Sequence, residues 1–346
     1  MTHKIALLGF GVVGQGLAEI LQDKGESLRS ELGFDAKIVA ISDVMKGSLY
    51  RPEGLDIAQV LQVVKETGKL ESYPETPGLI RGWDSFKTIL ESNADTIVEI
   101  TFTDVKTGQP AIDHCKTAFE SKKNVVMSNK GPVSLAYQEL AELAKKNDVR
   151  WGFEGTVMSG TPALKMPLVS LAGNNIFELR GILNGTTNYI LTKMEEGLSY
   201  QDALIEAQAL GYAEADPTSD VEGYDSQYKA TILANVVMNI PMKREEVECV
   251  GISHLTQQDI QWAKSSGKRW KLIAECKKDG DKVIAKVGPE AIPLTDPLAG
   301  VLGAQNAITY NCDLAGPITL IGAGAGRKET GFSILIDLIN MSRGQI

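Results

Sequence analysis

The sequence predicts an α/β protein: a doubly wound parallel sheet, followed by an α+β domain with a mixed sheet. Three observations predict this fold class. Apolar runs of strand length alternate with helical patterns over the first 155 residues, as βαβ units require. A glycine-rich turn separates the first apolar run from the first helix. Beyond about residue 155, strand patterns follow one another around glycine-containing turns, which favours antiparallel neighbours.

The expected elements follow from apolar periodicity and from the residues at their ends. Ser199 is the expected N-cap of one helix, and Gly211 is its C-terminal glycine. In the first domain we expect strands at 4–10, 36–43, 94–101, 124–130 and 149–155, and helices after the glycine turn and at 55–68, 110–122 and 137–148. In the second we expect a strand and a helix within 177–194, helices at 199–211 and 224–239, paired strands within 268–292, strands at 307–314 and 318–324, and a closing helix.

Composition excludes several classes of protein. Of the 346 residues, 43% are hydrophobic and 23% are charged, which allows a large core and two domains. The net charge of −9, without any basic run, argues against nucleic acid or an anionic membrane surface as a partner. No signal peptide or transmembrane segment is expected, and the four cysteines form no CxxC pair. We therefore expect a cytoplasmic protein.

The segment "GFGVVG" has the glycine spacing of a dinucleotide-binding turn. Gly9 allows the tight turn, Gly11 lets the backbone approach a pyrophosphate, and Gly14 lets the helix pack close to the strand. Because the turn follows a strand and opens a helix, it predicts a Rossmann-type domain. The alternative is a strand–helix turn without a ligand. The expected cofactor contacts in this turn are Gly9, Phe10, Gly11, Val12, Val13 and Gly14.

The second strand ends in an acidic residue, Asp43, at the place where such domains bind a ribose diol. Its carboxylate would repel a 2′-phosphate, which favours NAD over NADP. Lys46 and Arg51 follow closely, however, and either could meet a phosphate. Both cofactors therefore stay open, as does the alternative that Asp43 is a solvated strand end.

A second glycine-rich turn, "GAGAG", precedes the last helix and suits a nucleotide site. We therefore predict three segments. Residues 1–150 form the nucleotide-binding domain, residues 151–312 form the catalytic domain, and residues 313–346 return to the first domain.

A hydride-transfer enzyme needs a proton donor or acceptor, and lysine is the better candidate here. His3, His114 and His254 all lie at unsuitable places in the sequence. Lys130 ends a strand at the carboxyl edge of the predicted sheet, where ligands bind. Lys229 lies near the start of a helix, four residues after an aspartate. A solvated strand end and a surface ion pair are the alternatives for the two lysines.

The segment "LGYAEADPTSDVEGYDSQYK" places five carboxylates shortly before Lys229. A metal site, a solvated loop or a pocket for a cationic substrate would each explain this charge. The spacing does not fit an EF-hand, which disfavours the metal. A solvated loop is disfavoured because the stretch leads directly into a helix with an apolar face at Ile232, Leu233, Val236 and Val237.

Several motifs together resemble the homoserine dehydrogenase family, over nearly the whole chain. "GFGVVGQG" is similar to the nucleotide turn of that family, and "VVMSNKG" to its VVTANK segment. "FEGTVMSGTP" resembles its E-x-x-V-x-x-G-x-P segment, and "GAGAG" its terminal nucleotide-contacting turn. "GILNGTTNYIL" and "LGYAEADPTSDVEGYDSQYK" resemble its two most specific signatures.

The resemblance implies an NAD(P)-dependent enzyme that interconverts L-homoserine and L-aspartate 4-semialdehyde in amino-acid biosynthesis. It also implies a Rossmann domain joined to a mixed-sheet catalytic and dimerisation domain, in a homodimer or a dimer of dimers. Lys229 would be the proton donor, and Lys130 would touch substrate and cofactor. Glu214 would hold the substrate ammonium, and Asp220, Asp225, Tyr212, Gly185 and Thr186 would complete the substrate pocket. Thr101, Thr103 and Gly324 would join the cofactor contacts.

Family members often bind a monovalent cation, usually sodium, through backbone oxygens. The matching positions are Glu154, Val157, Ser159 and Thr161. This chain departs from the family here, because it has "VMSGT" where the family more often has a VGGG-like run. Val44 follows Asp43 where some NADP-preferring members carry arginine. We expect no C-terminal ACT domain and no threonine feedback through one.

Three other functions stay open from the sequence. The first is a related oxidoreductase that acts on another amino-acid semialdehyde or hydroxy acid. The second is a phosphorylating semialdehyde dehydrogenase, which would need a nucleophilic cysteine with a histidine partner. Cys115 and His114 are neighbours, but adjacent residues on a helix point in different directions. The third is a nucleotide-binding sensor without catalysis.

Overall fold

The computed structural model describes residues 2–104 and 106–345, and the chain divides into two compact units. The first unit runs to Thr156 and resumes at Gly326, and the second unit is Val157–Ala325. We placed these two boundaries at 150/151 and 312/313. Residues 313–325 lie in the second unit because they contain a strand that pairs there. Among the described residues, none of the helices has the length and apolar content needed to cross a bilayer.

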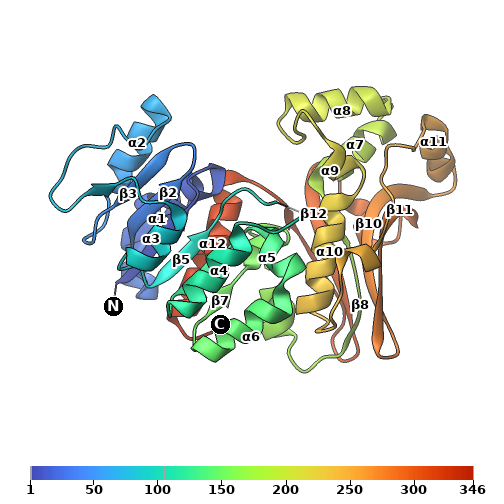
Figure 1. Ribbon diagram of the computed structural model, residues 1–346. Helices are drawn as coiled ribbons and strands as arrows, with labels where there is room; N and C mark the ends of the chain where they lie inside the picture. Colours follow the sequence, from blue (N-terminus) through green and yellow to red (C-terminus); the bar gives the residue numbers. More distant parts are fainter. Residues whose placement is uncertain (1, 105, 346) are drawn as a thin grey trace. The chain divides into compact units, whose positions relative to one another are not determined.

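The first unit contains a largely parallel sheet with the strand order β4-β3-β2-β1-β5-β6-β7 (Figure 1). The expected doubly wound core, from β2 to β7, is parallel. An antiparallel edge formed by β3 and β4 was not predicted; it lies in the polar stretch 46–82. The strands are β1 (His3–Leu8), β2 (Ala36–Asp43), β3 (Gly47–Tyr50), β4 (Ile80–Arg81), β5 (Thr96–Glu99), β6 (Asn124–Met127) and β7 (Trp151–Gly152).

The helices of the first unit connect these strands, and the last helix comes from the end of the chain. Polar N-caps define several starts: the Asp56 carboxylate accepts from Gln59 N, and the Asp84 carboxylate accepts from Lys87 N. The helices are α1 (Val12–Leu32), α2 (Ile57–Thr67), α3 (Ser85–Glu91), α4 (Ala111–Glu120), α5 (Lys130–Leu135), α6 (Tyr137–Asn147) and α12 (Arg327–Ser342), with a 3-10 turn at Glu154–Thr156.

The strand order determines where a ligand would bind the first unit. β1 lies between β2 and β5, so the connections from β1 to its two neighbours leave in opposite directions. Such a switch point opens a crevice at the carboxyl ends of the strands. The loops after β1, β2 and β5 therefore form the edge that is relevant to function.

The α12 helix packs against α1 through two glycines. A Cβ at Gly16 would lie 2.1 Å from the Arg327 carbonyl oxygen, and a Cβ at Gly331 would lie 2.7 Å from the Gly16 carbonyl carbon. Ion pairing adds to this contact, because the Arg327 guanidinium contacts the Glu19 carboxylate at 2.6 Å. That hydrogen bond also lowers the pKa of Glu19. The C-terminal segment is thus part of the first unit's core.

The second unit contains a mixed sheet with the order β13-β12-β8-β10-β11-β9. Neighbouring strands are antiparallel except for β9, which pairs in parallel with β11. The strands are β8 (Ile176–Ile182), β9 (Glu248–Cys249), β10 (Lys268–Asp279), β11 (Lys282–Pro293), β12 (Gln305–Cys312) and β13 (Gly316–Ala323). The helices are α7 (Gly185–Glu195), α8 (Tyr200–Ala209), α9 (Thr218–Val221), α10 (Tyr224–Val236) and α11 (Gln257–Ser265), with short helical turns at Met166–Ser170, Arg244–Glu246 and Pro297–Gly300.

The helix that carries Lys229 is buried on all sides, which corrects the expected single apolar face. In α10, every residue from Ser226 to Val236 is buried. Its polar side chains are satisfied internally: the Thr231 hydroxyl donates to the Gln227 carbonyl, and the Asn235 amide donates to the carbonyls of Thr231 and Met242. Buried polar groups need such partners. This helix is therefore a fixed support for the site.

The glycine contact between α1 and α12 gives a first prediction. Gly331→Ala should lower the urea midpoint of unfolding, because the new Cβ meets the backbone of Gly16 and Leu17 at 2.7 Å. Overpacking of this kind costs about 1–3 kcal/mol. Gly25→Ala, in α1, is the control, because its Cβ meets nothing within 4 Å and alanine favours a helix. Equal midpoints for Gly331→Ala and the wild type would contradict the role of Gly331.

Candidate active site

The glycine turn after β1 has the geometry that a dinucleotide requires. Gly9 has φ 97°, and a Cβ there would lie 2.6 Å from the Ile100 carbonyl oxygen. A Cβ at Gly14 would lie 3.0 Å from the Gly9 carbonyl oxygen, so α1 packs closely on the turn. A Cβ at Gly11 would meet nothing within 4 Å. The backbone is therefore open at the residue that a pyrophosphate approaches, at the start of a helix.

Asp43 ends β2 and is tied to the glycine turn. Its carboxylate accepts hydrogen bonds from the backbone N–H groups of Phe10 at 2.7 Å, and of Met45 and Lys46 at 2.9 Å. The Arg51 guanidinium donates instead to the carbonyls of Gly54 and Pro77. Arg51 therefore donates to these carbonyls, and the Asp43 carboxylate places a negative charge beside the glycine turn.

Exposed apolar side chains occupy the tips of the loops along this edge. Val12 is 61% exposed, Val44 fully exposed, Met45 70% exposed and Phe102 88% exposed. These residues follow β1, β2 and β5, whose carboxyl ends are adjacent. Scattered apolar residues on a surface need no explanation, but a row along a predicted ligand edge suits the flat faces of a dinucleotide.

Lys130 begins a helix rather than ending a strand, which corrects our expectation. The strand stops at Met127, and Asn129 caps α5 by accepting from Gly131 N at 3.0 Å. Lys130 is half-buried at this first helical position. Thr101 and Thr103 likewise lie beyond the end of β5, in the adjacent loop, and both are half-buried. The residues predicted to contact the nicotinamide end therefore lie in the loop after β5 and at the start of α5.

In the second unit, Lys229 is 6% exposed and is held by two acceptors. Its ammonium lies 2.6 Å from an Asp225 carboxylate oxygen and 2.6 Å from the Leu183 carbonyl oxygen. A lysine ammonium has three N–H donors. Two are directed at the protein, and one remains for another acceptor. The expected pairing of Lys229 with Asp225, four residues earlier on the helix, is present as a nearly buried ion pair.

Asn184 connects the two predicted aspartates, and sequence reasoning missed it. Its amide nitrogen donates to Asp220 at 2.7 Å and to Asp225 at 3.0 Å. Its amide oxygen accepts from Thr187 N at 2.9 Å, so Asn184 is also the N-cap of α7. An asparagine directly before a helix is a recognisable cap. The sequence "LNGTT" therefore indicates the cap, but it does not indicate that Asn184 also contacts Asp220 and Asp225.

Of the substrate residues predicted around α7 and α8, Thr186 and Tyr212 contact each other, whereas Glu214 is exposed. Thr186 donates to the Tyr212 carbonyl at 2.5 Å, and the Tyr212 ring lies 4.9 Å from the Tyr189 ring. Glu214 is exposed, and among the residues that the structure describes no side chain pairs with its carboxylate. The Asp216 carboxylate accepts from the Thr218 hydroxyl, which lowers the pKa of Asp216, so this residue stabilises its own turn.

Gly185 and Gly324 both lie against Asn306 in the second unit. A Cβ at Gly324 would lie 2.2 Å from the Asn306 amide group, and a Cβ at Gly185 would lie 3.3 Å from the Asn306 amide oxygen. Asn306 is fully buried. Both positions thus require glycine for packing, and their predicted ligand contacts stay predictions.

Comparisons with known proteins agree with this geometry. Residues 162–339 match the sequence model described as homoserine dehydrogenase, and residues 1–111 match the one described as Glutamate/Leucine/Phenylalanine/Valine dehydrogenase. The chain is 41% identical to the NAD(+)-dependent homoserine dehydrogenase of Pseudomonas canavaninivorans, covering 98% of this chain and 96% of that relative. The chain belongs to the homoserine dehydrogenase family.

Other homoserine dehydrogenases match over similar lengths. That of Methanocaldococcus jannaschii is 42% identical over 97% of this chain and 98% of its own. The solved structure of a putative homoserine dehydrogenase from Archaeoglobus fulgidus has a TM-score of 0.88 at 36% identity, covering 98% of this chain and 99% of that one. A hyperthermophilic archaeal homoserine dehydrogenase in complex with NADPH has a TM-score of 0.84 at 32% identity, covering 99% and 98%.

The positions that match the family's cation site fall within residues 154–161. Glu154 is in the first unit, and Val157, Ser159 and Thr161 are in the second. Met158 and Ser159 are consecutive left-handed residues, with φ 56° and 51°. Non-glycine residues hold such strained angles only where the surroundings enforce them. The loop is thus tightly turned where the family more often has glycine.

Cys115 and His114 do not form a nucleophile–base pair, which disfavours a phosphorylating semialdehyde dehydrogenase. Cys115 is fully buried, and burial raises the pKa of its thiol well above the usual value. A thiol that stays protonated is a poor nucleophile. His114 instead contacts Glu99 and Ser85 through its two ring nitrogens.

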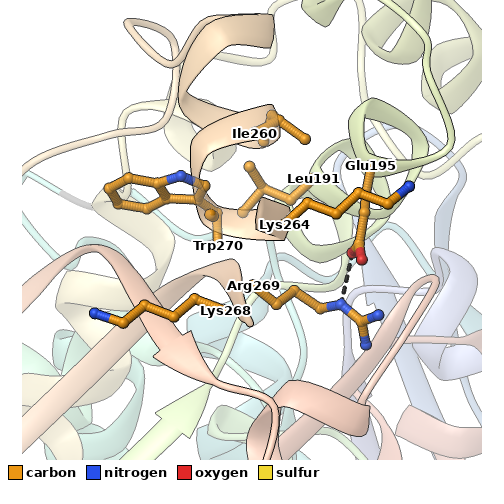
Figure 2. Close-up of a pocket in the computed structure, with 8 residues that line it drawn as sticks. Leu191, Glu195, Ile260, Lys264, Lys268, Arg269 and Trp270 are labelled. Atoms are coloured by element: carbon orange, nitrogen blue, oxygen red, sulfur yellow. Dashed lines mark ion pairs between the residues drawn. The ribbon is translucent and has the colours of Figure 1, made fainter. Parts of the chain in front are cut away.

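A small hollow in the second unit lies away from the predicted site residues. Figure 2 shows the Glu195 carboxylate facing the Arg269 guanidinium, and the ion pair measures 2.6 Å. Leu191 and Ile260 close the apolar side. The hollow belongs to the packing of α7 and α11 on β10, and its lining residues are Leu191, Glu195, Ile260, Ala263, Lys264, Lys268, Arg269 and Trp270.

Lys271 supports α7 from within the second unit. It is 1% exposed, and its ammonium donates to the Asn188 amide oxygen at 2.7 Å and to the Val301 carbonyl at 2.5 Å. The Asn188 amide in turn donates to the carbonyls of Val301 and Gln305. Burial lowers the pKa of Lys271 to about 7. The helix that begins at Gly185 is therefore anchored by a lysine that loses its proton near neutrality.

This anchoring predicts a pH dependence of stability. In the unfolded chain Lys271 stays protonated up to about its ordinary pKa of 10.5, but in the folded chain it releases the proton near pH 7. The unfolded state therefore binds more protons between these values, so stability should rise with pH by about 1.4 kcal/mol per pH unit. Lys271→Met should flatten this rise, as measured by urea unfolding at pH 7, 8 and 9. Parallel pH profiles for both proteins would contradict it.

Proposed function

We propose that the protein interconverts L-homoserine and L-aspartate 4-semialdehyde with a nicotinamide dinucleotide as hydride carrier. The arrangement of Lys229, Asp225 and Asn184 supports this most directly, because it holds an ammonium donor at the start of α7. Membership of the homoserine dehydrogenase family supports the substrate. Incubating the purified protein with L-homoserine and either NAD or NADP, and recording the absorbance of the reduced nicotinamide, tests the proposal.

We assign the proton transfer to Lys229. The cofactor, when bound, supplies or accepts the hydride. Lys229 uses two N–H donors on Asp225 and the Leu183 carbonyl, and its third donor serves the substrate oxygen. A fixed positive charge at a developing alkoxide is a large contribution to catalysis. Asp225 orients this lysine directly, and Asn184 joins Asp225 to Asp220.

The remaining predicted residues would bind the substrate and the cofactor. Glu214 is exposed, which suits capture of the substrate ammonium. Lys130, at the first position of α5, would add positive charge beside the nicotinamide. Thr101 and Thr103 would line the same end of the cofactor, and Gly324 would approach it from the terminal glycine turn.

We propose NAD as the preferred cofactor. Asp43 places a carboxylate beside the glycine turn, and Val44 beside it offers no charge to a 2′-phosphate. Arg51 is occupied by two backbone carbonyls. The relative from Pseudomonas canavaninivorans, at 41% identity, is named NAD(+)-dependent. One observation favours NADP: the Lys69 ammonium lies 2.5 Å from the Met45 carbonyl, near the same turn.

We further propose a sodium ion at Glu154, Val157, Ser159 and Thr161, and a cytoplasmic homodimer. The left-handed backbone at Met158 and Ser159 supports the ion, because strained backbone of this kind often occurs at ligand sites. Exposed Ile284 and Ile321 on the second unit's sheet support association through that unit. Activity in sodium compared with choline salts, and sedimentation of the purified protein, test these two points.

Lys229→Ala should lower kcat for homoserine oxidation by about 100- to 10,000-fold, because the substrate oxygen loses the side chain that exchanges its proton. NADH affinity should survive, because Lys229 belongs to the substrate end. Steady-state rates and NADH fluorescence titration measure the two quantities. Lys277→Ala is the control, since Lys277 is a 59% exposed lysine of the same unit. Near-normal turnover of Lys229→Ala would overturn the assignment.

The cofactor proposal predicts a higher kcat/KM with NAD than with NADP. Asp43→Asn should weaken NAD use and lower the NAD to NADP ratio by about tenfold, which corresponds to about 1.4 kcal/mol. Asp35→Asn is the control, because Asp35 precedes β2 at the opposite edge of the sheet. Initial rates with both cofactors measure the ratio. A wild-type preference for NADP would refute the role given to Asp43.

A further inference from the structure

Glu99, the last residue of β5, is a fully buried carboxylate at the edge where the cofactor is expected. One oxygen accepts from Thr101 N at 2.9 Å, from the Thr101 hydroxyl at 2.5 Å and from the Asn129 amide at 3.4 Å. The other oxygen lies 2.5 Å from His114 Nδ1. A charge taken out of water needs such a set of donors.

His114 holds this carboxylate from the side of α4. It is 1% exposed, and its Nε2 lies 2.8 Å from the Ser85 hydroxyl at the start of α3. The Phe86 ring packs against the imidazole with a centroid distance of 4.9 Å. Because both ring nitrogens have partners, the orientation of the imidazole is fixed. A ring held in this way also fixes the Glu99 rotamer.

Asn129 extends the same network to the second cofactor loop. Besides Glu99, its amide nitrogen lies 3.3 Å from both the Thr101 and Phe102 carbonyl oxygens. Its amide oxygen caps α5, the helix that starts at Lys130. One buried carboxylate therefore sets the conformation of the loop after β5 and the start of α5. These two loops carry Thr101, Thr103 and Lys130.

We propose that Glu99 and His114 are positioning residues for hydride transfer: they hold the Thr101 and Lys130 loops in the geometry that aligns the nicotinamide. This rests on the proposed function, since it concerns the same cofactor. Neither residue touches the reacting atoms in this scheme. Their effect is transmitted by Thr101 and Asn129, because these two donate to Glu99 and also form the loops.

The order Ser85–His114–Glu99 is also the hydrogen-bond order of a nucleophile, a base and an acid. The Glu99 oxygen that does not contact His114 distinguishes a catalytic triad from a positioning network. In this protein it is shared by Thr101 and Asn129, which belong to the cofactor loops. The network thus continues to the cofactor edge, and we assign it to positioning.

The test compares Glu99→Gln and His114→Gln in the full-length protein with the wild type. We expect kcat to fall about 10- to 100-fold, since misplacement of a reacting group by about 1 Å has effects of this size. The deuterium isotope effect, measured with L-homoserine deuterated at its alcohol carbon, should increase because hydride transfer becomes slower. NAD affinity should fall, whereas ADP-ribose, which lacks the nicotinamide, should bind as in the wild type.

Two controls separate positioning from folding. Cys115→Ala changes the next residue of α4, which is equally buried, and should leave kcat and the isotope effect unchanged. If the Glu99 and His114 variants do not fold, Thr101→Val decides, because it leaves both residues in place and removes the hydroxyl that donates to Glu99 and accepts from the Asn129 amide. Its kcat should fall, its isotope effect should rise, and Thr101→Ser should restore both.

Unchanged kcat and isotope effect in Glu99→Gln, or an equal loss of NAD and ADP-ribose binding, would overturn the positioning role. The wild-type assay keeps the two proposals apart. A wild-type protein that does not oxidise homoserine refutes the proposed function, while the NAD and ADP-ribose affinities of the variants still test positioning. An active wild type with unaffected variants refutes only the inference about Glu99 and His114.

Discussion

A charge buried away from water must be surrounded by partners of opposite polarity, and in each unit this requirement fixes the loops that carry the predicted site residues. In the second unit the charge is the Lys229 ammonium, which Asp225 and the Leu183 carbonyl surround. In the first unit it is the Glu99 carboxylate, surrounded by His114, Thr101 and Asn129. Removing one partner of a buried pair costs about 3–5 kcal/mol. The chain segments that supply the partners are therefore held in place before any ligand arrives.

Exposed charges in the same chain have no comparable effect. Arg29 and Asp35 form an ion pair at 3.1 Å, but the Arg29 side chain is 65% exposed. Such pairs contribute about 0–1 kcal/mol and do not determine a backbone conformation. Lys229 and Glu99, in contrast, are buried and have hydrogen-bond partners among the predicted site residues and the segments next to them.

The fold was largely predictable because its signals are local. The Gly9 turn, the Ser199 cap and the alternating strands and helices depend on neighbours within a few residues, and the structure has all of them. The β3–β4 edge was missed because its strands are short and lie within a polar stretch. Lys130 was placed on a strand because an apolar run precedes it. The helix start that Asn129 caps ends that strand three residues earlier, at Met127.

Contacts within the candidate site were predictable only where the two partners are close in the sequence. Lys229 and Asp225 are one helical turn apart, so their pairing could be expected. The link from Asn184 to Asp220 spans 36 residues, and that from Glu99 to His114 spans 15. A single histidine on a helix indicates packing until its partner on a neighbouring strand is known. Periodicity carries no information about such pairs, because the topology of the sheet brings them together.

The two ends of the chain also constrain the nucleotide edge together. The glycine turn needs α1 in place, and α1 packs on α12 through Gly16 and Gly331. At the other end of the sheet, the Asp337 carboxylate of α12 accepts from Glu154 N at 2.8 Å, where the chain leaves the first unit. The first unit is therefore complete only after the chain has passed through the second unit and returned. The binding edge around Gly9 consequently depends on residues more than 300 positions further along the sequence.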